Sequence, residues 1–203
     1  MSDTPLSYQL QTLSSAILHW QSALLNILQG PAGEPGQQHP DGAIGGPAIN
    51  GYRLLIAPAS RRGEALRYGL NGLATALPEL ASDSPDPHSG WHNSNQLLSE
   101  HFASNDGVCC GPQAVLYCRT LGPDWYLPSR EELQAILAMA ALLDAADSST
   151  GSLTFAAMAS GHLWSSSSHN LHNSWALPAS GGPPVSHNRS SAHYVLPVRR
   201  VAL

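Results

Sequence analysis

Apolar residues between positions 6 and 28 recur alternately four and three residues apart, which is the spacing of a heptad seam. The a and d positions of this seam are Leu6, Leu10, Leu13, Ile17, Trp20, Leu24 and Ile27. A single helix of this length is only marginally stable in water, so it needs a partner surface. That partner is either the chain's own domain or the same helix in other copies. The regular seam favours other copies, and we predict that residues 1–29 form a coiled-coil, anchoring helix.

Three Gly-X-Y triplets follow this seam directly, with glycine at Gly30, Gly33 and Gly36. Glycine at every third position suits a rope of three polyproline-II chains, because only glycine fits at its axis. The alternative is an ordinary Pro/Gly linker. Since a heptad seam and a collagen-like segment can both be three-fold, we predict a homotrimer in which residues 30–50 are a collagen-like Gly/Pro linker.

Residues 51–203 are predicted to form one α+β domain. Its clearest helix opens at Ser129, where Ser129 and Glu132 make a capping box, and continues to about Asp144. Weaker helical patterns lie near 66–80 and within 100–121, and residues 59–95 are otherwise mostly loop. Predicted strands lie at 51–58, 162–165, 174–177 and 192–201.

The charge balance excludes some partner classes. Only 11% of residues are charged, the nine basic residues are all arginine, and the net charge is −5. Nucleic-acid binding requires a basic face, so nucleic acid is not an expected partner. No apolar run is long enough for membrane insertion, and no secretory signal is visible at the N-terminus. Cys109, Cys110 and Cys118 favour buried free thiols, with a Cys110–Cys118 disulfide as the alternative.

No catalytic or metal-binding constellation stands out, so we expect no enzyme, metal or cofactor. The ten histidines form no H-E-x-x-H motif, and no G-x-S-x-G elbow is present. Ligand contacts are instead expected in three loops rich in Ser, Asn and His, where side chains hydrogen-bond adaptably. The candidate ligand-binding residues are Trp91, His92, Asn93, His169, Asn170, His172, His187, Asn188 and Arg189.

An ordered series of motifs resembles one known family. Residues 124–133 (DWYLPSREEL) resemble the "W-x-L-P-[ST]-x-x-E-L" signature of the Lcl-type C-terminal domain. Residues 163–167 (LWSSS), 175–177 (WAL) and 194–199 (YVLPVR) are similar to its later strands. Trp125, Trp164 and Trp175 lie in these motifs and are expected in the core. The loops at 59–95 and 178–191 depart from the family in being richer in Gly, Pro, Ser and His.

That family occurs in phage tail and virion proteins and in bacterial collagen-like adhesins, and its fold is similar to the C-type lectin fold. The resemblance therefore implies a C-type-lectin-like recognition domain over 51–203, on a trimeric fibre, spike or tail-tip component of a phage virion. Its expected partners are other virion proteins, through the N-terminal helix, and a host-surface glycan or protein. The alternatives are a head or tail decoration protein without receptor binding, and a bacterial collagen-like surface adhesin.

Overall fold

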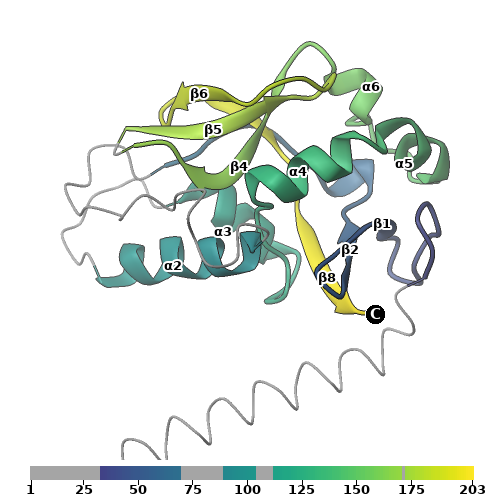
Figure 1. Ribbon diagram of the computed structural model, residues 1–203. Coiled ribbons are helices and arrows are strands. Elements are labelled where there is room, and N and C mark those ends of the chain that lie inside the picture. The colour runs from purple at the N-terminus through teal and green to yellow at the C-terminus, as the bar shows by residue number, and fades with distance from the viewer. Residues whose placement is uncertain (1–32, 70–88, 104–111, 171) are drawn as a thin grey trace, which may run out of the picture.

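A computed structural model describes residues 33–69, 89–103, 112–170 and 172–203. The predicted coiled-coil helix, with all seven seam residues, lies outside the described residues, as do Cys109 and Cys110. The described chain is an α+β fold with a three-stranded and a five-stranded sheet. Figure 1 shows the five-stranded sheet above α2, with β1, β2 and β8 near the C-terminus. Its elements are β1 (Ile44–Ile49), β2 (Tyr52–Ile56), a 3-10 turn (Ala59–Arg61), β3 (Gly63–Arg67), α2 (Gly90–Ala103), α3 (Gln113–Thr120), α4 (Arg130–Leu137), α5 (Ala140–Ala146), α6 (Phe155–Met158), β4 (His162–Ser168), β5 (Asn173–Pro178), β6 (Val185–Asn188), β7 (Ala192–Val195) and β8 (Val198–Ala202).

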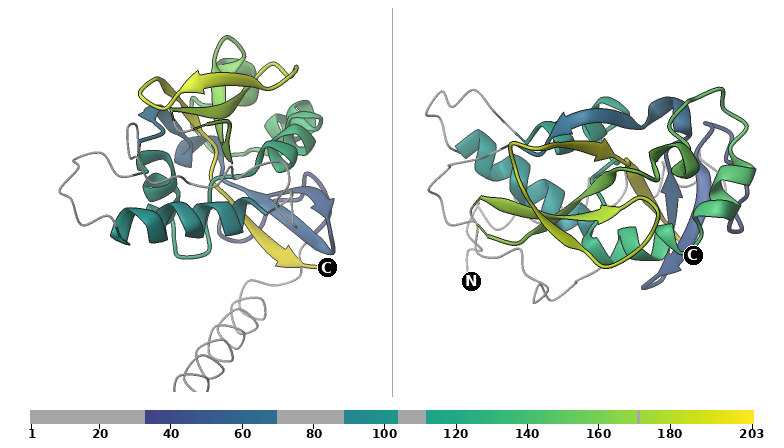
Figure 2. Two further views of the ribbon diagram at one scale, coloured as in Figure 1. Left: turned by 60° about the vertical axis from the view of Figure 1, so that its left-hand side comes forward. Right: turned by 90° about the horizontal axis from the view of Figure 1, so that it is seen from above.

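The three-stranded sheet joins the two ends of the domain in the order β1-β2-β8. Strands β2 and β8 pair antiparallel over their whole length, from Tyr52 opposite Ala202 to Ile56 opposite Val198. The left view of Figure 2 shows β8 beside β1 and β2, away from the strands of the larger sheet. This pairing closes the domain, because it brings together segments about 150 residues apart in sequence.

The linker predicted for residues 30–50 is wrong from residue 33 onward. Strand β1 lies inside that range and pairs with β2. Gly33 and Gly36 have φ values of 63° and 78°, whereas a collagen-like chain needs φ near −75°. The Gly36 amide also donates a hydrogen bond of 2.7 Å to the Gly45 carbonyl. The second and third Gly-X-Y triplets therefore belong to the folded domain, because sheet hydrogen bonds within one chain fix their backbone.

The capping box that opens α4 is confirmed. The Glu132 amide donates to the Ser129 hydroxyl at 3.2 Å, and the Ser129 amide donates to the Glu132 carboxylate at 2.8 Å. The helix predicted to reach Asp144 is divided in two, since α4 ends at Leu137 and α5 begins at Ala140. The Met139 amide closes a tighter turn onto the Ile136 carbonyl at 2.9 Å. The apolar faces of both short helices still pack into one core cluster.

The remaining predictions for individual elements meet mixed outcomes. Strands β4 and β5 confirm the predicted ones, while 192–201 is interrupted at Leu196–Pro197 and divided between the two sheets. Strand β3 and the start of α2 occupy a range predicted as loop, and residues 66–67, predicted as weakly helical, belong to β3.

Trp125 and Trp164 are buried as expected, whereas Trp175 is only half-buried. Cys118 is a buried free thiol, and burial raises its pKa. Among the described residues, no helix is long and apolar enough to cross a bilayer.

Candidate functional site

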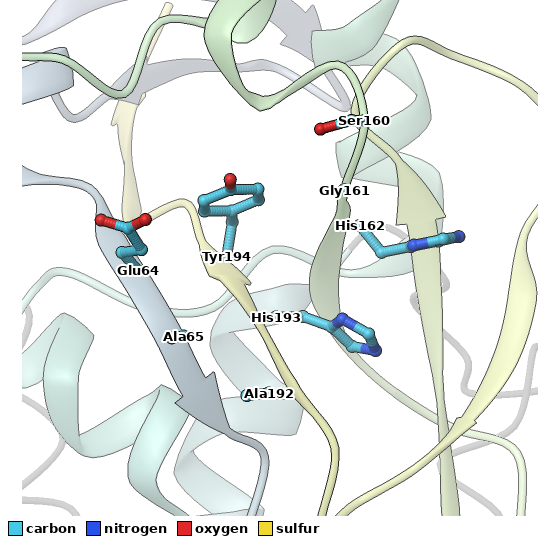
Figure 3. A pocket seen from close by; sticks show the side chains of 8 residues that line it. All are labelled: Glu64, Ala65, Ser160, Gly161, His162, Ala192, His193 and Tyr194. Atoms are coloured by element: carbon cyan, nitrogen blue, oxygen red, sulfur yellow. The ribbon is translucent and has the colours of Figure 1, made fainter.

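A pocket of about 320 Å³ opens where β3, β7 and the start of β4 meet. Strand β3 contributes Glu64 and Ala65, and β7 contributes the segment 192–194. Ser160, Gly161 and His162 complete it from the turn that leads into β4. The volume lies at the lower end of the range for small-molecule sites. Figure 3 shows the Glu64 carboxylate, the Tyr194 ring and the Ser160 hydroxyl toward one end, with the rings of His162 and His193 on the side away from Glu64.

Two backbone features shape this pocket. The β3–β7 register shifts between Gly63 and Leu66, and within that bulge Ala65 has a φ of 53°, which is uncommon for a residue with a side chain. Gly161 lies so close to Tyr194 that an added Cβ would approach the tyrosine ring to 2.5 Å. Strain and close backbone approach of this kind gather at sites where a fold holds functional groups in place.

Three polar groups that line the pocket have no protein partner. Among the described residues, the carboxylate of Glu64 and the hydroxyls of Ser160 and Tyr194 make no hydrogen bond or ion pair to another group. Glu64 carries the one permanent charge in the lining, because no arginine contributes to it. The pocket therefore offers hydrogen-bonding groups and a negative charge to a ligand, beside the aromatic ring of Tyr194.

Three histidine rings from three strands meet on one side of the pocket, and we call them the imidazole cluster: His162 on β4, His187 on β6 and His193 on β7. Their ring centroids lie 4.4 to 5.4 Å apart, and the ring of His193 lies 4.5 Å from the buried Trp164. Burial first, and then the neighbouring His187 and His162, lower the pKa of His193 to about 4. The pKa of His187 is lowered by burial and by His162. His193 is therefore uncharged at neutral pH.

The imidazole cluster is not a ready-made metal centre. No group of three or more His, Cys, Asp or Glu side chains is arranged to hold a metal ion in the parts of the chain that the structure describes. The Nε2 atoms of His187 and His193 are buried, and neither has a hydrogen-bond partner. A buried nitrogen without a hydrogen-bond partner destabilises the folded state, so three histidines packed beside a buried tryptophan are unusual.

The structure brings together two of the three loops that were predicted to bind a ligand. Asn173 and Asn188 are directly paired, and the Arg189 amide donates to the His172 carbonyl at 2.9 Å. The side chains of His169, Asn170, His172 and Asn188 are exposed at this end of the sheet. The side-chain oxygens of Asn170 and Asn188 accept hydrogen bonds from their own turns, as asparagine commonly does there.

Arg189 and Asn93 were predicted to contact a ligand, but both side chains are buried and hydrogen-bond within the fold. The guanidinium of Arg189 donates to the Ser174 hydroxyl at 3.1 Å and to the Ser168 hydroxyl at 2.8 Å. The amide of Asn93 donates to the Ser166 hydroxyl at 3.3 Å. Only 2% of Arg189 and 5% of Asn93 is exposed, so neither side chain reaches a surface ligand without rearrangement.

The loop around Trp91 is separate from the other two predicted loops. Trp91 is half-buried at the start of α2 and packs edge-on against Tyr126, with 5.9 Å between ring centroids. The guanidinium of Arg119 lies 4.6 Å from its ring. His92, the next residue, is exposed. Trp91 therefore belongs to the margin of the core, and its predicted surface role has no support in its packing.

Sequence reasoning missed all of the residues that line the pocket. Of the imidazole cluster, His187 was among the predicted binding residues, whereas His162 and His193 were not. The chain carried one usable signal, which is that three histidines fall on short β-like segments near the C-terminus. Their convergence depends on the order of strands in the sheet, which local patterns do not specify.

Compared with protein-family profiles and with curated protein sequences, the chain matches none. Among solved structures, a crystal structure of a fimbrial protein from Bacteroides ovatus is similar, with a TM-score of 0.49 and 15% sequence identity. The match covers 72% of this chain but only 35% of that protein, so the chain spans about a third of its length. A similarity this weak supports no inference about fold or function.

Proposed function

We propose that the chain is a non-enzymatic recognition protein whose pocket between β3, β7 and β4 binds a small polar ligand. The observation that carries this proposal is the unpartnered set of Glu64, Ser160 and Tyr194 around a cavity of about 320 Å³. Polar groups without protein partners beside an aromatic ring are typical of sites that recognise hydroxyl-rich ligands. No metal or cofactor is needed for such recognition.

The charge of the pocket indicates which ligands fit. The carboxylate of Glu64 accepts hydrogen bonds and repels anions, and no arginine lines the pocket to offset it. His193 adds no positive charge at neutral pH. A neutral sugar unit satisfies these groups best, because its hydroxyls donate to the carboxylate and its ring face packs on Tyr194. An acidic sugar would place a second negative charge beside Glu64.

The resemblance of the sequence motifs supports a more specific assignment. We propose a C-type-lectin-like domain carried on a trimeric fibre, spike or tail-tip component at the surface of a phage virion, for attachment to the host. The N-terminal helix would join the copies and contact other virion proteins. A decoration protein without receptor binding, or a bacterial collagen-like surface adhesin, is the alternative. Binding to intact host cells separates attachment from decoration, because a decoration protein binds only the particle.

The ligand proposal predicts selective binding of neutral sugars. In calorimetric titrations at pH 7.5 with glucose, galactose, mannose and glucuronic acid, at least one neutral hexose should bind about tenfold more tightly than glucuronic acid, a difference of about 1.4 kcal/mol. Glu64→Gln should weaken binding of that hexose by about tenfold, since a charge-assisted hydrogen bond contributes about 1.5–3 kcal/mol. Tyr194→Phe should weaken it less.

The matched control is Glu131→Gln, which changes a carboxylate on α4 outside the pocket. It should bind as the wild type does. If Glu64→Gln bound the hexose as tightly as the wild type, or if the wild type bound no neutral hexose, the ligand proposal would be contradicted. Hydrolysis of a glycan by the purified protein would contradict its non-enzymatic part.

The trimer proposal predicts a solution mass three times that of the 21.4 kDa chain. It rests chiefly on the heptad seam, because two of the three Gly-X-Y triplets belong to the folded domain. Light scattering after size exclusion should show the trimer for the wild type, and Ile17→Asp at an a position should shift it toward monomer. Gln21→Asp, outside the seam, is the control. A wild-type chain that stays monomeric at high concentration would rule the trimer out.

A further inference from the structure

The sheet is most weakly joined at the imidazole cluster. Strands β4 and β7 pair in parallel through one residue pair, Leu163 opposite Tyr194. His162 precedes Leu163, and His193 precedes Tyr194, so two of the three clustered rings flank that pair. Strand β3 is attached to the sheet through β7, with an irregular register. The β3–β7 ribbon carries five of the eight residues that line the pocket. It therefore joins the rest of the sheet beside these histidines, with one further hydrogen bond from the Trp164 indole to the Leu66 carbonyl at 2.9 Å.

The curvature of the sheet makes the cluster possible. Strands β6 and β7 follow each other in the chain but occupy separate places in the order β3-β7-β4-β5-β6. The rings of His187 and His193 are nevertheless 4.4 Å apart, so the β6 edge must curl back toward β7. The buried Trp164 lies beneath, within 6.4 Å of the His187 ring. In their uncharged form the three imidazoles fill this concave space as aromatic rings.

Among the described residues, no carboxylate forms an ion pair with a ring of the cluster. Strand β5 carries no charged residue, and the one titratable side chain of β4 is His162 itself. Strand β3 contributes Glu64 and Arg67, on either side of the Leu66 that pairs with His193. The β6–β7 turn contributes Arg189, whose donors are taken up by serine hydroxyls, and β7 contributes Tyr194. The electrostatic effects on His187 and His193 come from neighbouring imidazoles, and both effects oppose protonation.

We propose that His162, His187 and His193 form an acid-sensitive latch, which holds the β3–β7 ribbon and its pocket in place at neutral pH and releases them when the rings become protonated. Protonation would place two or three cations within 5.4 Å of one another, next to the sheet's weakest pairing. The resulting repulsion acts between β4, β6 and β7, and separation of β7 carries β3 with it. The opening of the ribbon does not depend on the proposed function of the pocket. The release of a ligand during that opening does rest on the proposed function.

The direction of the pH effect follows from linkage. An imidazole in water titrates near pH 6.5, whereas His193 is held at a pKa of about 4 in the closed ribbon. The open state therefore binds protons more readily, and acid favours it. Closure is fully stable above about pH 6.5 and weakens progressively as the pH falls toward 4.

Hydrogen–deuterium exchange without any ligand tests this latch in the full-length protein. Between pH 7.5 and pH 5, and after correction for intrinsic exchange rates, amides in β3 and β7 should exchange about tenfold faster in acid. Amides in β2 and β8, which belong to the other sheet, should change little. The double variant His187→Phe with His193→Phe keeps aromatic rings that cannot titrate, so it should lose the acid response. His92→Phe, an exposed histidine on α2, should keep it.

A second measurement guards against a double variant that fails to fold. In proton NMR of the wild type, the imidazole signals of His187 and His193 should titrate below the ordinary imidazole pKa of about 6.5. Titration of both rings at or above pH 6.5, or unchanged exchange of β3 and β7 in acid, would overturn the latch. Failure of the hexose titration at pH 7.5 would instead overturn the proposed ligand and leave the latch standing.

Discussion

Replacing Glu132 with alanine is expected to lower the free energy of unfolding by about 3–5 kcal/mol, because it leaves several buried donors without an acceptor. The Glu132 carboxylate accepts the Ser129 amide at 2.8 Å, the Gly90 amide at 3.0 Å and the Tyr126 hydroxyl at 3.2 Å. It thereby joins the starts of α2 and α4 to the segment that pairs with β8. Chemical denaturation followed by circular dichroism measures the change.

Glu131→Ala is the matched control, since it removes the adjacent carboxylate of the same helical turn. Glu131 pairs at 2.6 Å with Arg130 near the surface, where ion pairs contribute about 0–1 kcal/mol. Equal losses in the two variants would show that the loss of a negative charge from the first turn of α4, and not the buried network, accounts for the effect.

The same carboxylate should make stability depend on pH. Burial raises the pKa of Glu132 to about 7, although its hydrogen bonds to Ser129, Gly90 and Tyr126 favour the charged form. An acid whose folded pKa is raised stabilises the fold fully below its unfolded pKa, near 4.5, and loses that contribution as the pH rises through 7. The wild type should therefore lose stability between pH 5 and pH 8 relative to Glu132→Gln, which does not titrate.

Arg62→Ala should also cost about 3–5 kcal/mol, because it leaves a buried negative charge without its partner. The Arg62 side chain is fully buried, and its guanidinium lies 3.3 Å from Asp147, which is 1% exposed. It also donates to the carbonyls of Ala57 at 3.1 Å and Leu153 at 2.7 Å. Arg62 immediately precedes β3, so its loss should loosen the strand that carries Glu64 into the pocket.

The neighbouring Arg61→Ala gives a close comparison for thermal and chemical unfolding. Arg61 is exposed, and the hydrogen bond that it accepts from Tyr117 uses its backbone carbonyl, which the substitution keeps. It should change stability by no more than about 0.5 kcal/mol. If Arg62→Ala were as mild, the buried ion pair would have no net role in the fold.

Features governed by short-range interactions were predictable from the sequence. The capping box placed the start of α4 correctly, because both of its hydrogen bonds form within four residues. Strands β4 and β5 were located by β-propensity and flanking turns, and Trp164 by the usual burial of tryptophan. The α+β class followed from these elements alone.

Errors arose where distant segments decide the local backbone. The Gly-X-Y pattern at 33–38 fits a collagen-like rope, yet pairing with β1 imposes positive φ values on two of its glycines. Arg189 lies in a polar loop that is typical of a binding surface, yet three serine and asparagine oxygens draw its guanidinium inward. In each case hydrogen bonds to residues remote in sequence or in a neighbouring strand outweigh local composition.

The sequence by itself determined the start of α4, strands β2, β4 and β5, and the burial of Trp125 and Trp164, because capping and hydrophobic periodicity act over a few residues. Only the tertiary structure decided the pocket and the imidazole cluster. Glu64, Ser160 and Tyr194 meet there across more than 120 residues of chain, and three histidines meet because the sheet curls β6 back toward β7. Strand order and curvature are set by burial of the whole chain, which no local pattern encodes.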